Sequence, residues 1–256
     1  MLNNSIKQKL KNDEIVFGTF FKIYSPAMIE IIGKLGFDFT IIDTEHNSLN
    51  YTEVENLVRA ADSVGMCSII RTQDDSEPTI LHALDTGAGG IQVPSLHSVD
   101  EVKGVIAKSK YFPLGMRGWG NGTRAGDYAL VTAKEYLEYS NENSIIIIHI
   151  ENVEMVEKIE ELCQIPCIDV FFVGPGDLSQ SMGKPGQIND PEVVANVEKV
   201  ITTARKYGKS VGTYIASEAS MEKYIKLGAR YIVWKSDMAI YVEALKSAIQ
   251  NLTRFR

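Results

Sequence analysis

Charged side chains stand at the ends of several apolar, β-branched segments of this sequence. Carboxylates that come close together repel one another unless a cation neutralises them. Oxygen ligands are those that Mg²⁺ and Mn²⁺ prefer, and His46 and His149 leave cobalt or another transition metal as a further choice. These residue types therefore suggest a divalent-metal site, provided that the fold gathers the segment ends. The charged residues at these ends are Asp43, Glu45, Arg71, Glu151 and Asp177, with His46 beside them.

Each of these residues also has an ordinary structural interpretation when it is taken alone. Acidic residues just before a helix are common caps, and a histidine in a loop or an arginine at the surface needs no function. For Asp177, which follows Gly174-Pro175-Gly176, a cap on the next helix is the better interpretation in isolation. A functional site is favoured only if the fold brings these residues together. The strands and helices that carry them therefore have to be identified.

A strand-like segment followed by a helix-like segment recurs along the chain. The strand-like segments are apolar on both faces, and about 250 residues is the usual length of one β/α barrel. The sequence therefore predicts a single (β/α)8 TIM barrel over residues 1–256 rather than an open sheet. The predicted strands are residues 15–21, 37–43, 67–71, 90–94, 145–150, 168–173, 210–215 and 231–234. The predicted helices include residues 25–32, 52–64, 77–85, 99–109, 153–163, 191–207 and 238–251.

In such a barrel the carboxyl ends of the strands meet at one mouth, where the chemistry takes place. The charged segment ends should therefore lie together at that mouth. The backbone amides of Gly176 and Asp177 suit an anion such as a carboxylate, because glycine allows close approach and amides at a turn favour negative charge. The glycine-rich connection over residues 111–144 is expected to fold over the mouth as a loop and a short helix.

Composition excludes several classes of partner. The chain has 26 Lys and Arg against 33 Asp and Glu, a net charge of −7, and its scattered basic residues argue against nucleic acid. No run of about 20 apolar residues indicates a membrane span, and residues 1–11 lack the features of a secretory signal, so a cytoplasmic location is expected. Cys67, Cys163 and Cys167 form no C-x-x-C pattern and are expected to be reduced core thiols.

From Gly18 to about Ala244 the sequence resembles the HpcH/HpaI aldolase/citrate lyase family, in particular its class II pyruvate aldolases of 4-hydroxy-2-oxo acids and 2-keto-3-deoxy sugar acids. The resemblance implies reversible cleavage of such an acid into pyruvate and an aldehyde, by an enolate that a divalent metal stabilises. Magnesium or manganese is the expected metal, and cobalt is a further choice. The motifs that carry the resemblance are Asp43-Thr44-Glu45-His46, Gly89-Gly90-Ile91 with Pro94, residues 111–118, Ile150-Glu151 and residues 174–179.

The resemblance also implies roles for individual residues. Glu151 and Asp177 would be the two metal ligands, and Arg71 would reach the keto oxygen while His46 handles the proton. Asp85 would cross a subunit interface to orient the histidine, in a homohexamer whose C-terminal helix packs onto a neighbour. The remaining implied positions are Gly176 and Asp177 at the substrate carboxylate and Phe20 at the pocket wall, with Asp43 and Glu45 as candidate supports of the ligands. His149 could be such a support, a third ligand or a core histidine.

Some features leave alternatives open. His149 stands where the family commonly has glutamine, and Phe20 where it often has tryptophan, so metal preference and aldehyde specificity are undecided. Trp119 and Arg124 could shape the aldehyde pocket or pack at an interface. Lys235 could instead form a Schiff base, and an acyl-coenzyme A lyase or a non-catalytic keto-acid-binding barrel are further alternatives. On the last helix, Ala239, Val242, Leu245 and Ile249 fit either a swap between subunits or packing within the chain.

Overall fold

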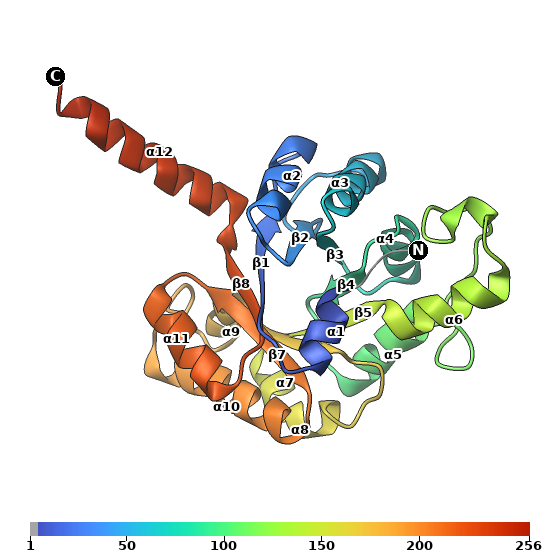
Figure 1. Cartoon of the computed structure of the whole chain (residues 1–256). Coiled ribbons are helices and arrows are strands. Elements are labelled where there is room, and N and C mark those ends of the chain that lie inside the picture. The colour runs from blue at the N-terminus through green and yellow to red at the C-terminus, as the bar shows by residue number, and fades with distance from the viewer. Residues whose placement is uncertain (1–4) are drawn as a thin grey trace.

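The computed structural model describes residues 5–256, and they form a closed parallel barrel (Figure 1). Each strand pairs with the next along the chain, and β1 pairs with β8 to close the ring. The predicted TIM barrel is therefore confirmed. The strands are β1 (Val16–Phe21), β2 (Phe39–Asp43), β3 (Cys67–Arg71), β4 (Gly90–Val93), β5 (Ile145–Ile150), β6 (Val170–Val173), β7 (Ser210–Ile215) and β8 (Tyr231–Ser236).

Helices surround the barrel, and most begin where the sequence predicts. Ser25 caps α2, as expected, by accepting a hydrogen bond from the backbone N–H of Met28. Two differences concern the region around the sixth strand: the predicted helix 153–163 is divided at Lys158, and a short helix, α9, replaces a predicted loop. The helices are α1 (Ser5–Lys11), α2 (Pro26–Lys34), α3 (Tyr51–Ser63), α4 (Glu77–Asp85), α5 (Val99–Ser109), the 3₁₀ turn η1 (Asp127–Ala129), α6 (Ala133–Asn143), α7 (Val153–Glu157), α8 (Ile159–Leu162), α9 (Pro175–Ser181), α10 (Pro191–Lys206), α11 (Glu218–Leu227) and α12 (Asp237–Thr253).

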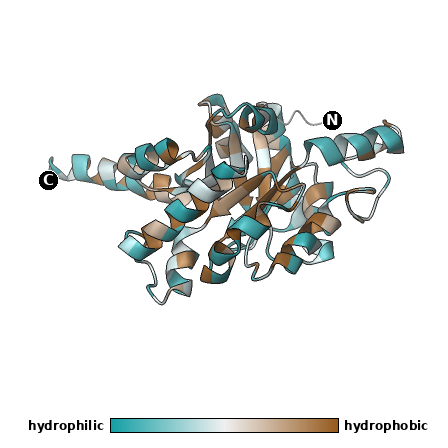
Figure 2. Ribbon diagram, turned by 90° about the horizontal axis from the view of Figure 1, so that it is seen from below, coloured by the Kyte–Doolittle hydropathy of each residue, from teal (hydrophilic) through white to brown (hydrophobic). Residues whose placement is uncertain are grey.

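Alternation along each strand separates two apolar layers. In β5, Ile145 and Ile147 point into the barrel, whereas Ile146, Ile148 and Ile150 pack against the surrounding helices. Figure 2 shows the same division, with apolar strands at the centre and polar outer faces on the helices. Ile6 and Leu10 of α1 join the inner layer. The same alternation aims every second residue of a strand at the interior, which places His149 on the inner side of β5.

The connection between α5 and β5 does not cover the mouth, so that expectation is wrong. Helices run back toward the amino ends of the strands, so a segment that leaves α5 and enters β5 lies at the opposite end of the barrel. Lys110, just after α5, donates from Nζ to the carbonyl of Ser144, just before β5, over 2.9 Å. Lys7 of α1 donates to the same carbonyl over 3.1 Å. The glycine-rich loop therefore cannot close over its own mouth.

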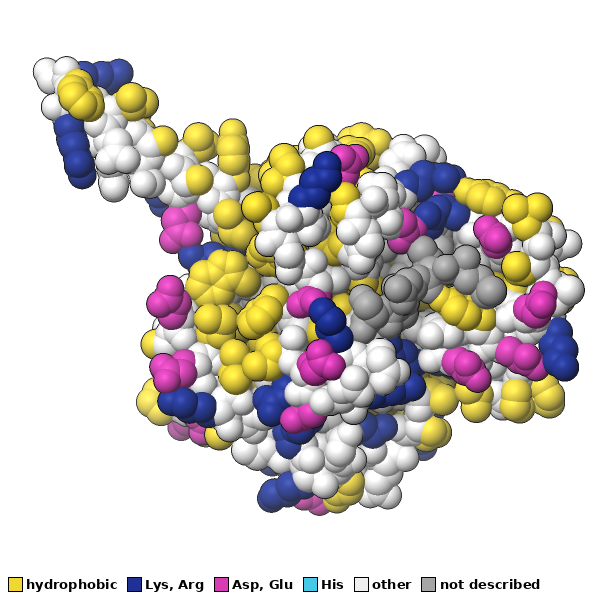
Figure 3. All heavy atoms as spheres, viewed as in Figure 1, with side chains coloured by type: hydrophobic (Ala, Val, Ile, Leu, Met, Phe, Trp, Pro, Cys, Tyr) yellow, Lys and Arg dark blue, Asp and Glu magenta, His cyan; other side chains and the backbone are white. Residues whose placement is uncertain are grey.

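The C-terminal helix α12 leaves the barrel (Figure 1). Its first turn is anchored by Asp237, whose Oδ2 accepts hydrogen bonds from the backbone N–H groups of Lys22 and Ile23. Beyond that turn, Val242, Leu245 and Ile249 are 44 to 50% exposed, so these side chains do not pack into the core formed by residues 5–256. Figure 3 shows hydrophobic side chains along this helix at the surface. The swap between subunits stays a prediction.

No helix within residues 5–256 combines the length and the hydrophobicity that crossing a lipid bilayer requires. Cys67 and Cys163 are buried, as expected of core thiols, whereas Cys167 is half-buried.

Gly212 offers a test of the barrel's close packing. A Cβ at this position would lie 2.0 Å from the carbonyl oxygen of Tyr231, on the neighbouring strand β8. We expect Gly212→Ala to lower the free energy of unfolding by roughly 1–3 kcal/mol, because the backbone must move. Gly104→Ala is the control: its Cβ would meet only the Lys108 side chain, and we expect about 0.5–1 kcal/mol of added stability in a helix. Urea unfolding measures both, and equal stabilities would contradict the packing described.

Candidate active site at the carboxyl ends of the strands

Arg71, the last residue of β3, lies at the centre of the polar groups at the mouth. Its guanidinium forms a two-bond pair with Asp43, through Nε to Oδ1 at 2.9 Å and Nη2 to Oδ2 at 2.7 Å. Its Nη1 lies 2.8 Å from Glu45 Oε2, and its Cζ lies 4.7 Å from the centre of the Phe20 ring. Only 7% of Arg71 is exposed. The planar guanidinium is thus held in place by Asp43, Glu45 and the Phe20 ring.

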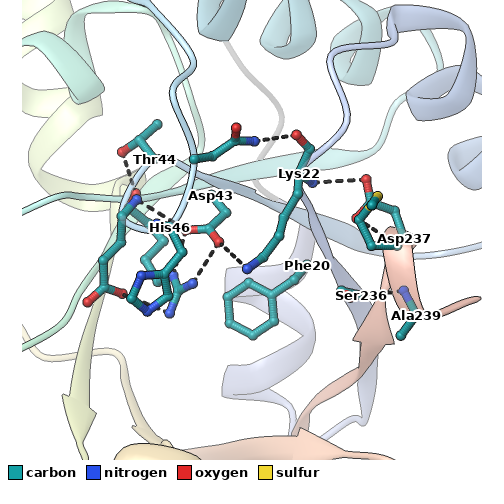
Figure 4. A network of polar contacts seen from close by, with 12 residues as sticks. Phe20, Lys22, Asp43, Thr44, His46, Ser236, Asp237 and Ala239 are labelled. Atoms are coloured by element: carbon teal, nitrogen blue, oxygen red, sulfur yellow. Dashed lines mark hydrogen bonds and ion pairs between the residues drawn. The ribbon is translucent and has the colours of Figure 1, made fainter.

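Asp43 is fully buried and has a second cation. Lys22 Nζ lies 3.2 Å from Asp43 Oδ2. Figure 4 shows Lys22 pointing toward this carboxylate. Burial raises the pKa of the Asp43 carboxyl, but the hydrogen bonds and charge of Arg71 outweigh it and hold the pKa below its usual range. In the less confined Glu45, burial outweighs the attraction of Arg71 and raises the pKa.

These pairs correct one inference from the sequence. Asp43 and Glu45 do not need a metal for neutralisation, because Arg71 and Lys22 already supply positive charge. Within residues 5–256, no group of three or more His, Cys, Asp and Glu side chains is arranged to hold a metal ion. The carboxylates at the mouth therefore do not all require a cation, and only Glu151 and Asp177 are left for a metal.

His46 lies at the rim of the same network (Figure 4). Its backbone N–H, like that of Glu45, faces Asp43 Oδ1, at 3.3 Å and 3.1 Å respectively. The side chain is 59% exposed, with Nε2 lying 3.9 Å from Glu45 Oε2. The buried Asp43 carboxylate thus fixes the loop, and the imidazole is left open to solvent.

Glu151 and Asp177 form the second part of the mouth. A Cβ on Gly174 would lie 3.0 Å from Glu151 Oε2 and 3.9 Å from Asp177 Oδ2, so the missing side chain leaves space between the two carboxylates. Glu151 Oε1 accepts a hydrogen bond from the backbone N–H of Ser95 at 2.6 Å, and Oε2 lies 2.7 Å from His149 Nδ1.

Burial raises the pKa of the Glu151 carboxyl, but the electrostatic attraction and hydrogen bond of His149, together with the hydrogen bond from the Ser95 N–H, lower it to about 2. Glu151 is therefore ionised at neutral pH. The N-cap of α9 is Gly174, so Asp177, in the first turn, is not the cap. Its carboxylate is left for another role.

A hollow of about 210 Å³ joins the two parts of the mouth. It brings together five predicted residues from four separate elements, β1, β3, β5 and α9. Aromatic residues form its wall, and Ile188 and Tyr214 belong to it although the sequence gave no signal for them. The predicted residues that line it are Phe20, Arg71, His149, Gly176 and Asp177.

Three predicted residues lie elsewhere. Asp85 ends α4 near the opposite end of the barrel, where its Oδ1 pairs with Arg117 Nη2 at 2.6 Å, so it cannot orient His46 within one chain. Arg124 pairs with Asp62 and donates to the carbonyl of Thr86, and Trp119 is half-exposed. Neither Arg124 nor Trp119 lines the hollow of its own chain.

Sequence reasoning missed Lys22, Ser95 and Gln92. Lys22 follows β1 and pairs with Asp43, while Ser95 follows β4 and binds Glu151. Gln92 carried a usable signal, because a polar side chain on the inner side of an apolar strand needs a buried partner. Its Nε2 lies 2.6 Å from His149 Nε2.

The Asp43–Arg71 pair gives a testable stability difference. Asp43→Asn leaves a buried guanidinium without its carboxylate, which costs about 3–5 kcal/mol in such pairs. Because the folded pKa of Asp43 is depressed, the pair stabilises the protein above pH of about 3.9, and the stabilisation is lost as the pH falls through the lower folded pKa. Urea unfolding of Asp43→Asn at pH 7 and toward pH 3 should show both effects. Glu45→Gln, at the more exposed partner of Arg71, is the control. An equal loss of stability in Glu45→Gln would contradict the conclusion that the buried Asp43 contributes more than Glu45.

Comparison with known proteins agrees with this arrangement. The 4-hydroxy-2-oxo-heptane-1,7-dioate aldolase of Shigella sonnei is 28% identical, over 96% of this chain and 94% of the relative. The 2-keto-3-deoxy-L-rhamnonate aldolase of Salmonella paratyphi B is also 28% identical, over 97% and 93%. The crystal structure of the citrate synthase SbnG superposes with a TM-score of 0.90 at 29% identity, over 98% of both chains.

The HpcH/HpaI aldolase/citrate lyase family model matches residues 17–244. This match covers β2 to β8 and all but the first residue of β1, together with the hollow and both carboxylates that flank Gly174. As the sequence motifs predict, the chain belongs to the HpcH/HpaI aldolase/citrate lyase family.

Proposed function

We propose that this chain is a class II aldolase that reversibly cleaves a 4-hydroxy-2-oxo acid or a 2-keto-3-deoxy sugar acid into pyruvate and an aldehyde. The supporting observation is the pair of carboxylates, Glu151 and Asp177, on either side of Gly174, at a hollow that Gly174, Asp177 and Arg71 line. Family membership and relatives named as aldolases support the same class of reaction.

The residues present fit a divalent metal. Glu151 is ionised at neutral pH, and the gap above Gly174 lies within reach of an oxygen from each carboxylate. Both ring nitrogens of His149 already have partners, so His149 does not add a nitrogen ligand. Two carboxylates with oxygens from water and substrate suit Mg²⁺ or Mn²⁺ better than cobalt. When bound there, the metal would polarise the keto group and offset the negative charge that develops on its oxygen.

The protein's own groups complete the reaction. The N–H groups of Arg71 donate to the keto oxygen, and the pair with Asp43 keeps the guanidinium in place. The amides of Gly176 and Asp177 hold the substrate carboxylate, and Phe20 limits access of water from the side. His46, open to solvent at the rim, takes the proton from the 4-hydroxyl group during cleavage and returns it during condensation.

Other reactions have less support from these observations. Lys235 does not line the hollow, and its Nζ lies 2.6 Å from Glu243 Oε2, which weighs against a Schiff base. The likeness to a citrate synthase favours a second candidate, in which the same hollow serves to form a carbon–carbon bond rather than to cleave one. An acyl-coenzyme A substrate and a non-catalytic role in keto-acid binding are outcomes that the experiments below would reveal. The cytoplasmic location stays a prediction.

Deuterium exchange of the pyruvate methyl group, followed by proton NMR in heavy water, tests the reaction without knowledge of the aldehyde. We expect no exchange after chelation and restored exchange with Mg²⁺ or Mn²⁺, because the enolate needs the metal. Asp177→Asn should reduce the restored rate at least about 100-fold, by analogy with the loss of one group that stabilises an oxyanion. Asp100→Asn, whose side chain is 92% exposed on α5, is the matched control and should exchange normally.

Each other outcome points to a named alternative. Exchange that survives chelation would favour Lys235 and a Schiff base, and exchange only with an acyl-coenzyme A would favour a lyase of that class. His46→Ala should keep metal-dependent binding of pyruvate but lose about 10²- to 10⁴-fold in aldol turnover. A His46→Ala protein that behaves like the unaltered chain would contradict the proposed proton transfer.

We further propose that the chain forms a homohexamer in which α12 packs onto a neighbour and Asp85 orients the His46 of a neighbouring subunit. The exposed apolar side of α12 supports this arrangement. Light scattering of the full chain should give the mass of a hexamer, and replacing both Leu245 and Ile249 by Asp should lower it, whereas Lys246→Ala should not. A monomeric mass for the unaltered chain would exclude the role of Asp85.

A further inference from the structure

A chain of buried hydrogen bonds crosses the interior of the barrel beneath the mouth. Tyr231 of β8 donates from its hydroxyl to Gln92 Oε1 at 3.3 Å, and Gln92 Nε2 lies 2.6 Å from His149 Nε2. His149 Nδ1 then lies 2.7 Å from Glu151 Oε2. Tyr231 and Gln92 are fully buried, and His149 is 2% exposed. Three side chains thus link the barrel core to one carboxylate of the site.

The order of donors and acceptors fixes the form of His149. A carbonyl oxygen only accepts, so the Tyr231 hydroxyl donates and Gln92 Oε1 is occupied. The amide NH₂ of Gln92 therefore faces the imidazole, and because an amide nitrogen only donates, His149 Nε2 must accept. The ring proton is left on Nδ1, where it is donated to Glu151. His149 thus accepts from Gln92 on one side of its ring and donates to Glu151 on the other.

This arrangement suits a carboxylate that has to bind a cation. The Nδ1–H of His149, 2.7 Å from Glu151 Oε2, orients the carboxylate through a hydrogen bond. Ser95 N–H holds Oε1 and His149 holds Oε2, so the carboxylate is fixed from both sides while the space at Gly174 stays open. Buried hydrogen bonds are stronger and more directional than exposed ones, which favours one orientation.

We propose that Gln92 and Tyr231 are positioning residues that act through His149 to hold Glu151 in the geometry for metal binding. The proposal rests on the metal-dependent function above and adds to it two residues that touch neither metal nor substrate. Neighbouring packing supports their fixed positions: the Tyr231 ring stacks on Phe39 with centres 4.1 Å apart, and the His149 ring lies 5.0 Å from that of Phe172.

The experiment measures Mn²⁺ binding by titration calorimetry or electron paramagnetic resonance and reads the imidazole directly by ¹⁵N NMR. The sequence has four histidines, so the His149 signals are those absent from His149→Phe. In the unaltered protein without metal we expect a proton on Nδ1 and none on Nε2. Tyr231→Phe, which keeps the ring and removes only the hydroxyl, should mix the two ring forms and raise the Kd for Mn²⁺ about 10-fold.

The controls separate positioning from general stability. Tyr136→Phe removes a hydroxyl of similar burial from a pair with Tyr111 far from the mouth and should leave the Kd unchanged. Gln92→Leu should weaken Mn²⁺ binding as Tyr231→Phe does. Adding Tyr231→Phe to His149→Phe should cause no further loss, because the effect passes through the imidazole. His149→Gln, which can both accept from Gln92 and donate to Glu151, should recover most of the affinity that His149→Phe loses.

A proton on His149 Nε2 in the unaltered protein, or a Kd that neither Tyr231→Phe nor Gln92→Leu changes, would overturn this proposal alone. If the unaltered chain binds no Mn²⁺, or if Asp177→Asn leaves Mn²⁺ binding intact, the proposed function fails first, and this proposal fails with it.

Discussion

The buried pair between Arg71 and Asp43 is the constraint on which the mouth of this barrel depends. A guanidinium that is 7% exposed must have its charge matched nearby, and Asp43 on the adjacent strand matches it with two hydrogen bonds. The same carboxylate also holds the backbone of Glu45 and His46. One ion pair therefore fixes both the group that faces the hollow and the loop that carries the exposed histidine.

The mouth divides its charges into two parts with different properties. On one side, Asp43 and Glu45 are saturated by Arg71 and Lys22. On the other, Glu151 and Asp177 have no arginine or lysine within an ion-pair distance among the described residues, and Glu151 is ordered by Ser95 and His149 instead. A bound metal would supply the positive charge that Glu151 and Asp177 lack, while Arg71 stays available to an anionic oxygen.

Much of the fold and of the mouth could be predicted from the sequence. The alternation of side chains along a strand is a local property, and the repeated order of strand and helix implies that the strands run in one direction. They were sufficient to place Arg71, His149, Gly176 and Asp177 at one mouth, whereas the position of Phe20 in the wall of the hollow was implied by the family resemblance. Partners across strands were not predictable in the same way: which carboxylate Arg71 pairs with depends on register and side-chain reach. Residues 111–144 were misplaced because their glycines were considered without the chain direction, which takes them to the other end of the barrel. The exposure of α12 depends on how few contacts it makes with the rest of its own chain. The spacing of apolar residues along a helix does not reveal this.

The isolation of α12 has a consequence for the energetics of the chain. A helix of 17 residues that contacts the barrel through its first two turns receives little tertiary support beyond them, and tertiary packing supplies most of the stability of helices in proteins. Its helical order and the covering of its apolar side are therefore one coupled equilibrium. A surface that covers Leu245 and Ile249 also stabilises the helical conformation of the last turns. The fraction of molecules in which the end of the chain is helical therefore rises with the fraction in which this surface is bound.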